Sequence, residues 1–250
     1  IERAPWQGAW RELAFLLVGL GVFCLLVFRD RPEDSGLEPD GGATAEEEST
    51  GPRAPEPDST RAQAVRTLDF WMVTLVLATL SMVGTGITFH IVDLGREAGL
   101  GAERVVAVFV PIAAVSVTVG FVVGYLVDRR PMTLLVRVMA VALMLLFAAS
   151  AHLGTSWGWW ITIVAWGLAA GFYGPLTVAA MPRLFGRRHL GAIGGVMTMC
   201  LVIGSALGPA WLAWFRQELG SYRIGLYCSM ALPLFVLLAS FVPRRSSAQP

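Results

Sequence analysis

Long apolar runs separated by short polar stretches dominate the pattern of this chain. A helix that crosses a bilayer needs roughly 20 mostly apolar residues, and seven runs approach or exceed that length. They are Trp10–Phe28, Phe70–Leu94, Arg104–Val127, Pro131–Ala151, Trp157–Met181, Leu190–Phe215 and Tyr222–Val242. Continuous apolar runs of this kind favour helices, whose backbone groups are all satisfied within the segment. The pattern therefore predicts an all-α, polytopic bundle of about seven transmembrane helices.

One long polar stretch interrupts this pattern and divides the chain. Residues 29–69 are rich in Pro, Glu, Ser and Gly, a composition that buries too little apolar surface to fold. The sequence thus predicts a single span in residues 1–28, a largely disordered linker in 29–69, a six-helix bundle in 70–243 and a short tail in 244–250.

The composition agrees with a membrane protein and excludes several other classes. The chain is 55% hydrophobic and only 15% charged, with a mean hydropathy of +0.63, whereas a soluble domain carries about 25% charged residues. The net charge of +1 gives no reason to expect a nucleic-acid partner. The three cysteines lie in apolar runs, and no Cys/His spacing indicates a metal site. We expect no metal and no cofactor.

Arginine side chains are unevenly divided between the two ends of the spans, which predicts the orientation in the membrane. Twelve lie on one side, namely Arg29, Arg31, Arg53, Arg61, Arg66, Arg129, Arg130, Arg183, Arg187, Arg188, Arg244 and Arg245. Six lie on the other side, namely Arg3, Arg11, Arg96, Arg104, Arg216 and Arg223. Basic loops face the cytosol, so we expect a cytosolic linker and a cytosolic C-terminus.

Glycine pairs in two of the spans suggest close helix packing and an internal repeat. Gly120 and Gly124, and likewise Gly204 and Gly208, form G-x-x-x-G motifs, which allow helix backbones to approach closely. These two spans, Arg104–Val127 and Leu190–Phe215, are the middle members of two successive sets of three helices. Because each set has an odd number of spans, the second set enters the membrane from the opposite side. Inverted three-helix repeats are a feature of transporters.

Three sequence motifs resemble those of a known family. Residues 124–130, G-Y-L-V-D-R-R, are similar to the G-x-L-x-D-R loop motif of the major facilitator superfamily (MFS). The start of the linker, R-D-R-P-E-D-S-G-L-E-P-D-G in 29–41, resembles its oxalate/formate antiporter and monocarboxylate transporter branch, as do F-G-R-R-H-L-G-A-I-G-G in 185–195 and the following G-S-A-L-G-P.

The resemblance implies that the spans correspond to helices 6–12 of an MFS transporter. They would be the last helix of the N-terminal half and the whole C-terminal half. The implied function is secondary active transport of a small solute, such as a monocarboxylate or related organic anion, by alternating access. In that fold the first helix of each triplet lines the cavity, which here means Phe70–Leu94 and Trp157–Met181. Phe70–Leu94 is also, by composition alone, the most polar span.

Five residues in these two spans are candidates for the path of the substrate or ion. His90 is an ionisable residue within a span, which favours a function such as proton coupling, although an interfacial histidine is the alternative. Thr85 and Thr88 offer hydroxyls to a substrate or bond their own helix carbonyls. Tyr173 and Trp166 share one helix face, where they line the cavity or simply pack.

The basic loop after the third span is a candidate gate. Asp128, Arg129 and Arg130, preceded by Gly124, match the family's loop motif, and an aspartate near a helix end can exchange partners between two conformations. The alternative is ordinary cytosolic positive charge. Arg137 lies seven residues beyond Arg130, about 10 Å at helical rise, and we expect it to reach the cytosolic interface rather than bind substrate.

Two observations limit the functional interpretation. The branch usually places a basic residue in the helix 8 or helix 11 equivalent, yet Arg104–Val127 has none after its first residue and Leu190–Phe215 has only Arg216 beyond its end. An anionic substrate would need a cation from His90 or from elsewhere. The chain also begins with Ile1 rather than Met, so we expect a fragment that lacks its N-terminal half.

Two other classes compete with a transporter. A seven-span receptor or a non-transporting membrane subunit would match the span count, but no sizeable sensor or output region is evident. A membrane enzyme would need clustered catalytic groups, which the spacing of His90, Asp93 and Arg137 does not provide. We therefore expect a non-enzymatic transporter that works with a bilayer and a small-molecule substrate, in a bacterial cytoplasmic (inner) membrane, with a proton as a candidate coupling ion.

Overall fold

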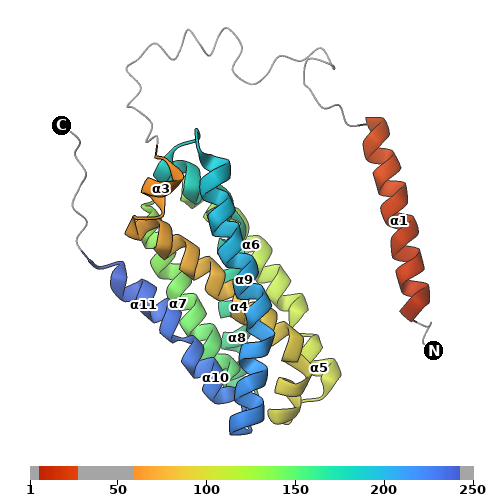
Figure 1. Ribbon diagram of the computed structural model, residues 1–250. Coiled ribbons are helices and arrows are strands. Elements are labelled where there is room, and N and C mark those ends of the chain that lie inside the picture. The colour runs from red at the N-terminus through yellow and green to blue at the C-terminus, as the bar shows by residue number, and fades with distance from the viewer. Residues whose placement is uncertain (1–5, 28–58, 243–250) are drawn as a thin grey trace. The chain divides into compact units, whose positions relative to one another are not determined.

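Every regular element in the described residues is a helix (Figure 1). The structure is a computed structural model that describes residues 6–27 and 59–242. Seven stretches in these residues are long and apolar enough to cross a membrane. The prediction of an all-α transmembrane bundle is therefore confirmed. Most of the expected linker, the motif in residues 29–41 and the tail at 244–250 lie outside the described residues.

The chain divides into two units, Ile1–Glu56 and Pro57–Pro250. Helix α1 (Trp6–Val27) is the described part of the first unit. Its apolar side chains, among them Phe15, Leu25 and Leu26, are exposed. A helix that is apolar on all sides suits a membrane span.

The second unit contains the other six spans. Four are single helices, α4 (Leu68–Glu97), α7 (Met132–Ser150), α8 (Ser156–Phe185) and α9 (Leu190–Leu219). Two consist of paired helices, α5 (Ala102–Val106) with α6 (Phe109–Val127), and α10 (Tyr222–Ser229) with α11 (Ala231–Ala239). The helices α4, α8 and α9 extend beyond the apolar runs, because polar residues tolerate the aqueous ends of a helix. Gly186 and Gly220, with φ of 82° and 71°, end α8 and α9.

The two paired spans are interrupted at equivalent positions relative to a proline. α6 begins two residues before Pro111, and α11 begins two residues before Pro233. A proline has no N–H to bond the carbonyl four residues earlier, so the helix is disrupted there. The same ring is tolerated in the first turn of the new helix, where that N–H has no partner anyway. The expected kink at Pro111 thus lies at Ala107 and Val108.

Helix packing within this unit pairs distant segments (Figure 1). α4 packs mainly against α9, and α6 packs mainly against α8. α7 contacts α8 and α11 and is the most buried span, with Leu143, Leu146 and Phe147 fully enclosed. α6 and α9 bury a much smaller share of their length and lie at the margin of the unit.

The last residues of the expected linker are structured, which the composition did not predict. Thr60 and Gln63 form a capping box at the start of the short helix α3 (Arg61–Ala64). The Ser59 N–H donates to the Phe185 carbonyl at the end of α8 (3.0 Å), and the Trp71 indole N–H donates to the Val65 carbonyl (2.8 Å). The signal was present as T-x-x-Q, within a stretch that is otherwise rich in disorder-promoting residues.

Candidate functional site

A pocket of about 480 Å³ lies between α4 and α8, and we call it the α4–α8 pocket. Its lining consists of Leu80, Ser81, Gly84, Thr85, Thr88, Phe89, Trp166, Ala170 and Tyr173. The structure thus brings together four of the residues singled out from the sequence, Thr85, Thr88, Trp166 and Tyr173. They come from the two helices expected to line a transport cavity.

Two hydroxyl pairs connect the walls of this pocket to neighbouring helices. The Ser81 and Tyr173 hydroxyls lie 3.3 Å apart and join α4 to α8. The Thr85 and Ser205 hydroxyls lie 2.9 Å apart and join α4 to α9. Thr85 therefore bonds across helices rather than to its own helix.

Other threonines in the bundle follow the local alternative. Thr79, Thr118 and Thr177 each donate to the carbonyl four residues earlier, at 2.7 to 2.9 Å. Because helical threonines so often do this, the different partner of Thr85 depends on the close approach of α9 rather than on its own sequence context.

The α4–α8 pocket offers hydrogen bonds and aromatic surface but no charge. Its hydroxyl groups are those of Ser81, Thr85, Thr88 and Tyr173, and no acidic or basic side chain lines it. Trp166 is 7% exposed and meets the ring of Phe109 edge to face, with 5.6 Å between centroids. Such a surface can orient a polar neutral group and contact an apolar one.

His90 does not line the α4–α8 pocket but joins three helices at another place. Its Nε2 lies 3.1 Å from the Pro209 carbonyl of α9, and its Nδ1 lies 3.2 Å from the Tyr222 hydroxyl of α10. A carbonyl only accepts, so Nε2 carries the proton, and in the neutral ring Nδ1 accepts from Tyr222. Asp93, one turn further along α4, is paired with Arg96 at 2.9 Å.

The predicted gate residues lie in the α6–α7 connection. Asp128 is the exposed C-cap of α6. The Arg129 guanidinium lies 3.8 Å from the centre of the Tyr125 ring and donates to the Tyr125 carbonyl at 3.2 Å. Arg183, near the end of α8, donates to the Arg130 carbonyl at 3.3 Å. The loop is thus tied to α8 through backbone rather than through an ion pair.

Arg137 contacts the end of α11. Its guanidinium donates to the hydroxyl and the carbonyl of Ser240 at 2.8 and 2.6 Å, and it lies 4.1 Å from the centre of the Phe241 ring. Cations are favoured at helix C-termini, where carbonyls lack partners. The residue therefore anchors α11 to α7, away from the α4–α8 pocket.

The predicted glycine motifs take different positions. Gly204 and Gly208 lie against the backbone of α4, whereas a Cβ at Gly120 would make only an ordinary 3.7 Å contact and one at Gly124 would meet no atom within 4 Å. Close contact between α6 and α8 occurs instead at Gly167 and Gly171, a further G-x-x-x-G pair.

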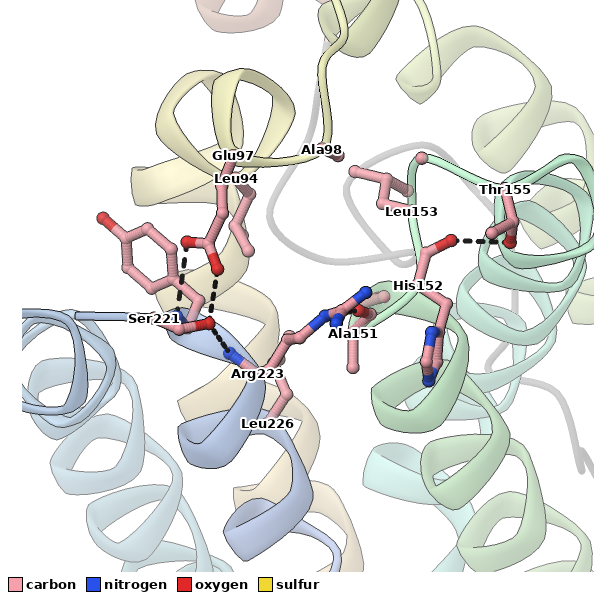
Figure 2. Close-up of a pocket in the computed structure, with 13 residues that line it drawn as sticks. Leu94, Glu97, Ala98, Ala151, His152, Leu153, Thr155, Ser221, Arg223 and Leu226 are labelled. Atoms are coloured by element: carbon pink, nitrogen blue, oxygen red, sulfur yellow. Dashed lines mark hydrogen bonds between the residues drawn. The ribbon is translucent and has the colours of Figure 1, made fainter. Parts of the chain in front are cut away.

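A second pocket, of about 380 Å³, lies where the end of α4, the α7–α8 connection and the start of α10 meet (Figure 2). We call it the Arg223 pocket. Glu97 of α4, His152 of the connection and Arg223 of α10 contribute polar groups. The sequence did not identify this pocket, because these residues follow three different spans and no spacing shows that they meet.

Comparison with known proteins gives the family. The sequence profile of the Major Facilitator Superfamily matches residues 2–209. Monocarboxylate transporter 11 of Mus musculus is 32% identical over 94 residues, which cover 36% of this chain and 20% of the mouse protein. The Homo sapiens protein of the same name is 33% identical over 79 residues, which cover 32% of this chain and 16% of the human protein.

These matches bear on three of the expectations from the sequence. Both relatives support the monocarboxylate-transporter-like branch, and the family supports a transporter over a receptor or an enzyme. Both relatives are mammalian, so the bacterial membrane stays a prediction. The profile match and the seven span-length helices agree: the chain is an integral membrane protein and belongs to the Major Facilitator Superfamily.

Proposed function

We propose that the protein is a secondary active transporter that moves a small solute by alternating access, with the α4–α8 pocket on the substrate path. The observation that carries this proposal is the pocket itself. It is formed by the first helices of the two three-helix sets, and four hydroxyls and three aromatic rings converge on it. Polar side chains inside a bundle of apolar membrane helices cost free energy, and they commonly mark the path of a substrate or ion.

The packing of the helices supports two inverted sets. The first helix of one set, α4, packs against the second helix of the other, α9, and the first helix of the second set, α8, packs against α6. This is the exchange expected of two repeats related by a two-fold axis in the membrane plane. Alternating access in such folds is a rocking of bundles around a central site.

For the substrate we propose a monocarboxylate or a related organic anion. The support is the name of the two relatives, both monocarboxylate transporters. Because the α4–α8 pocket contributes no cation, it would contact the neutral body of the solute, and the carboxylate would be bound by other groups. A proton role for His90 would act through its bonds to Tyr222 and Pro209, since the ring does not reach this pocket.

The orientation and the gate are parts of the same proposal. The excess of arginines supports a cytosolic position for the connection between α6 and α7, the linker and the C-terminus. Asp128, Arg129 and Arg130, tied to α8 through Arg183, would hold the cytosolic end of α6 against α8 and release it when the transporter opens to the cytosol.

Uptake of radiolabelled pyruvate and lactate into proteoliposomes tests the proposal, with the expected N-terminal half of the transporter present. Tyr173→Phe and Thr88→Val remove hydroxyls from the α4–α8 pocket, and one lost hydrogen bond of about 0.5–1.5 kcal/mol predicts a rise in KM of roughly 2- to 12-fold. Thr177→Val is the control, since Thr177 bonds its own helix and does not line the pocket. Uptake no greater than in empty liposomes would reject the substrate class, and equal KM values in all variants would reject the site.

A further inference from the structure

The Arg223 pocket contains one acidic side chain, and that side chain already has hydrogen-bond donors and a cation beside it (Figure 2). Glu97 accepts hydrogen bonds from the Ser221 hydroxyl and from the Tyr222 N–H, the latter at 3.4 Å. Its carboxylate also lies 3.8 Å from the Arg216 guanidinium. These contacts cap the start of α10 and compensate the negative charge of Glu97.

The cation of the pocket is Arg223, which is exposed. The Nε of Arg223 donates to the Ala151 carbonyl at 2.8 Å, and Figure 2 shows the guanidinium extending from α10 across the pocket toward that carbonyl. In the described part of the chain no acidic side chain forms an ion pair with Arg223. The bond through Nε holds a planar fork of N–H donors in place, the geometry that recognises carboxylate and phosphate oxygens.

One buried hydroxyl of the pocket lining has no partner within the described residues. Ser150 lines the same pocket and is only 4% exposed. Its Oγ has no hydrogen-bond partner among the described residues. A serine near a helix end usually finds a carbonyl, and leaving a buried hydroxyl unpaired costs about 1–3 kcal/mol. Because this oxygen is closed off from solvent in the described conformation, a ligand oxygen in the pocket would supply the missing acceptor after a turn of the Ser150 side chain.

We propose that the Arg223 pocket binds an anionic oxygen group, a carboxylate or a phosphate. The Arg223 guanidinium would donate hydrogen bonds to the anion and balance its charge, and the Ser150 hydroxyl would donate a further hydrogen bond. A volume of about 380 Å³ is within the usual range for small-molecule pockets, about 300–1,000 Å³. The pocket shares no lining residue with the α4–α8 pocket, so this site does not depend on the proposed transport function.

Thermal unfolding of the purified protein in lipid-free maltoside detergent tests the site directly. Sodium acetate and sodium phosphate are titrated against sodium chloride at equal ionic strength. We expect a saturable rise in Tm with acetate or phosphate beyond that with chloride. Arg223→Gln is expected to abolish the rise, and Arg223→Lys, which keeps the charge but loses the fork, to retain part of it.

Ser150→Ala is the decisive variant because its fold should be intact. Replacing an unpaired buried hydroxyl by hydrogen is near neutral for folding, whereas a lost hydrogen bond to an anion weakens binding by roughly tenfold or more. Thr162→Val is the matched control, since Thr162 is a buried, equally unpaired hydroxyl outside the pocket. We expect it to bind as the wild type does.

Two further arms identify the source of the anion and the results that overturn the site. If added phosphatidylglycerol removes the acetate effect, a lipid headgroup is the natural occupant; if the effect persists, a soluble anion is. No Tm rise with either probe would overturn the proposal. Equal apparent Kd values in wild type, Ser150→Ala and Arg223→Gln would do the same, because the rise would then come from elsewhere on the protein.

Discussion

The helix pairs α4–α9 and α6–α8 occupy equivalent places in the two three-helix sets, yet their contacts are chemically different. In α4–α9, backbone meets backbone. A Cβ built on Gly208 would overlap the Met82 carbonyl oxygen, one on Gly204 would lie 2.8 Å from the Ala78 carbonyl oxygen, and one on Gly86 would lie 2.8 Å from the Gly208 carbonyl oxygen.

In α6–α8 the atoms closest to the glycines belong to side chains, although a Cβ on Gly171 would also lie 2.8 Å from the Ser116 carbonyl oxygen and one on Gly167 would lie 3.1 Å from the Ile112 carbonyl oxygen. A Cβ on Gly167 would lie 2.6 Å from the Cβ of Val115, and a Cβ on Gly171 would lie 2.6 Å from the Cβ of Val119. Each valine therefore fills the notch left by a glycine. When a glycine faces a side chain, a smaller side chain on the partner helix can make room for a larger residue in place of the glycine. When a glycine faces a backbone, no such exchange is possible.

The comparison shows that equivalent positions in a repeat need not be equally tolerant of change. The α4–α9 contact fixes the distance between two helices, and the Thr85–Ser205 hydrogen bond across it depends on that distance. The α6–α8 contact fixes a fit between side chains. We therefore expect Gly→Ala substitutions to lower stability more in the α4–α9 contact, where the backbone must move, than in the α6–α8 contact.

The largest effect is expected for Gly208→Ala. Its methyl group would fall on a backbone carbonyl, so α4 and α9 must separate, at a cost of about 3 kcal/mol or more, the upper part of the range for overpacking. The measurement is the apparent Tm in detergent and the yield of monodisperse protein. Gly195→Ala is the control, because it lies in the same helix with no atom within 4 Å of its Cβ. Equal stability of the two variants would contradict the backbone contact.

A smaller and reversible effect is expected for Gly167→Ala. The new methyl group clashes with Val115, and we expect a loss of about 1–3 kcal/mol. Exchanging the partners by adding Val115→Gly removes the clash, although a glycine inside a helix itself costs about 1 kcal/mol. The double variant should thus be more stable than Gly167→Ala alone, measured as a double-mutant cycle. Additive losses would mean that the notch does not hold Val115.

The spans themselves were predictable from the sequence, because lipid requires long apolar helices whatever their neighbours. The α4–α8 pocket was predictable in part for a related reason. Thr85 and Thr88 stand out as polar residues in an apolar run, and the family resemblance identified α8 as the opposite wall. Their identification needed no knowledge of distant contacts.

Features that depend on a choice of partner were not predictable. The hydrogen bonds of His90 go to Pro209 and Tyr222, more than a hundred residues away. The residues next to His90 in the sequence do not show that its ring contacts these partners rather than the α4–α8 pocket. G-x-x-x-G marks a surface that allows close approach, but it does not name the helix that approaches. The sequence therefore pointed to Gly120 and Gly124, although Gly167 carries the equivalent contact from the opposite helix.

The smallest effect is expected for the glycine motif of α6. Gly120→Ala would make only an ordinary contact with the Gly171 carbonyl, and Gly124→Ala would meet open space. Alanine is the better helix former by about 1 kcal/mol, so both variants should be as stable as the wild type or slightly more stable in the same Tm assay. A loss as large as that of Gly167→Ala would mean that this face of α6 packs closely against something other than α8. If Gly124→Ala instead keeps its Tm but slows uptake, the motif that precedes Asp128 would act in movement of the loop rather than in packing.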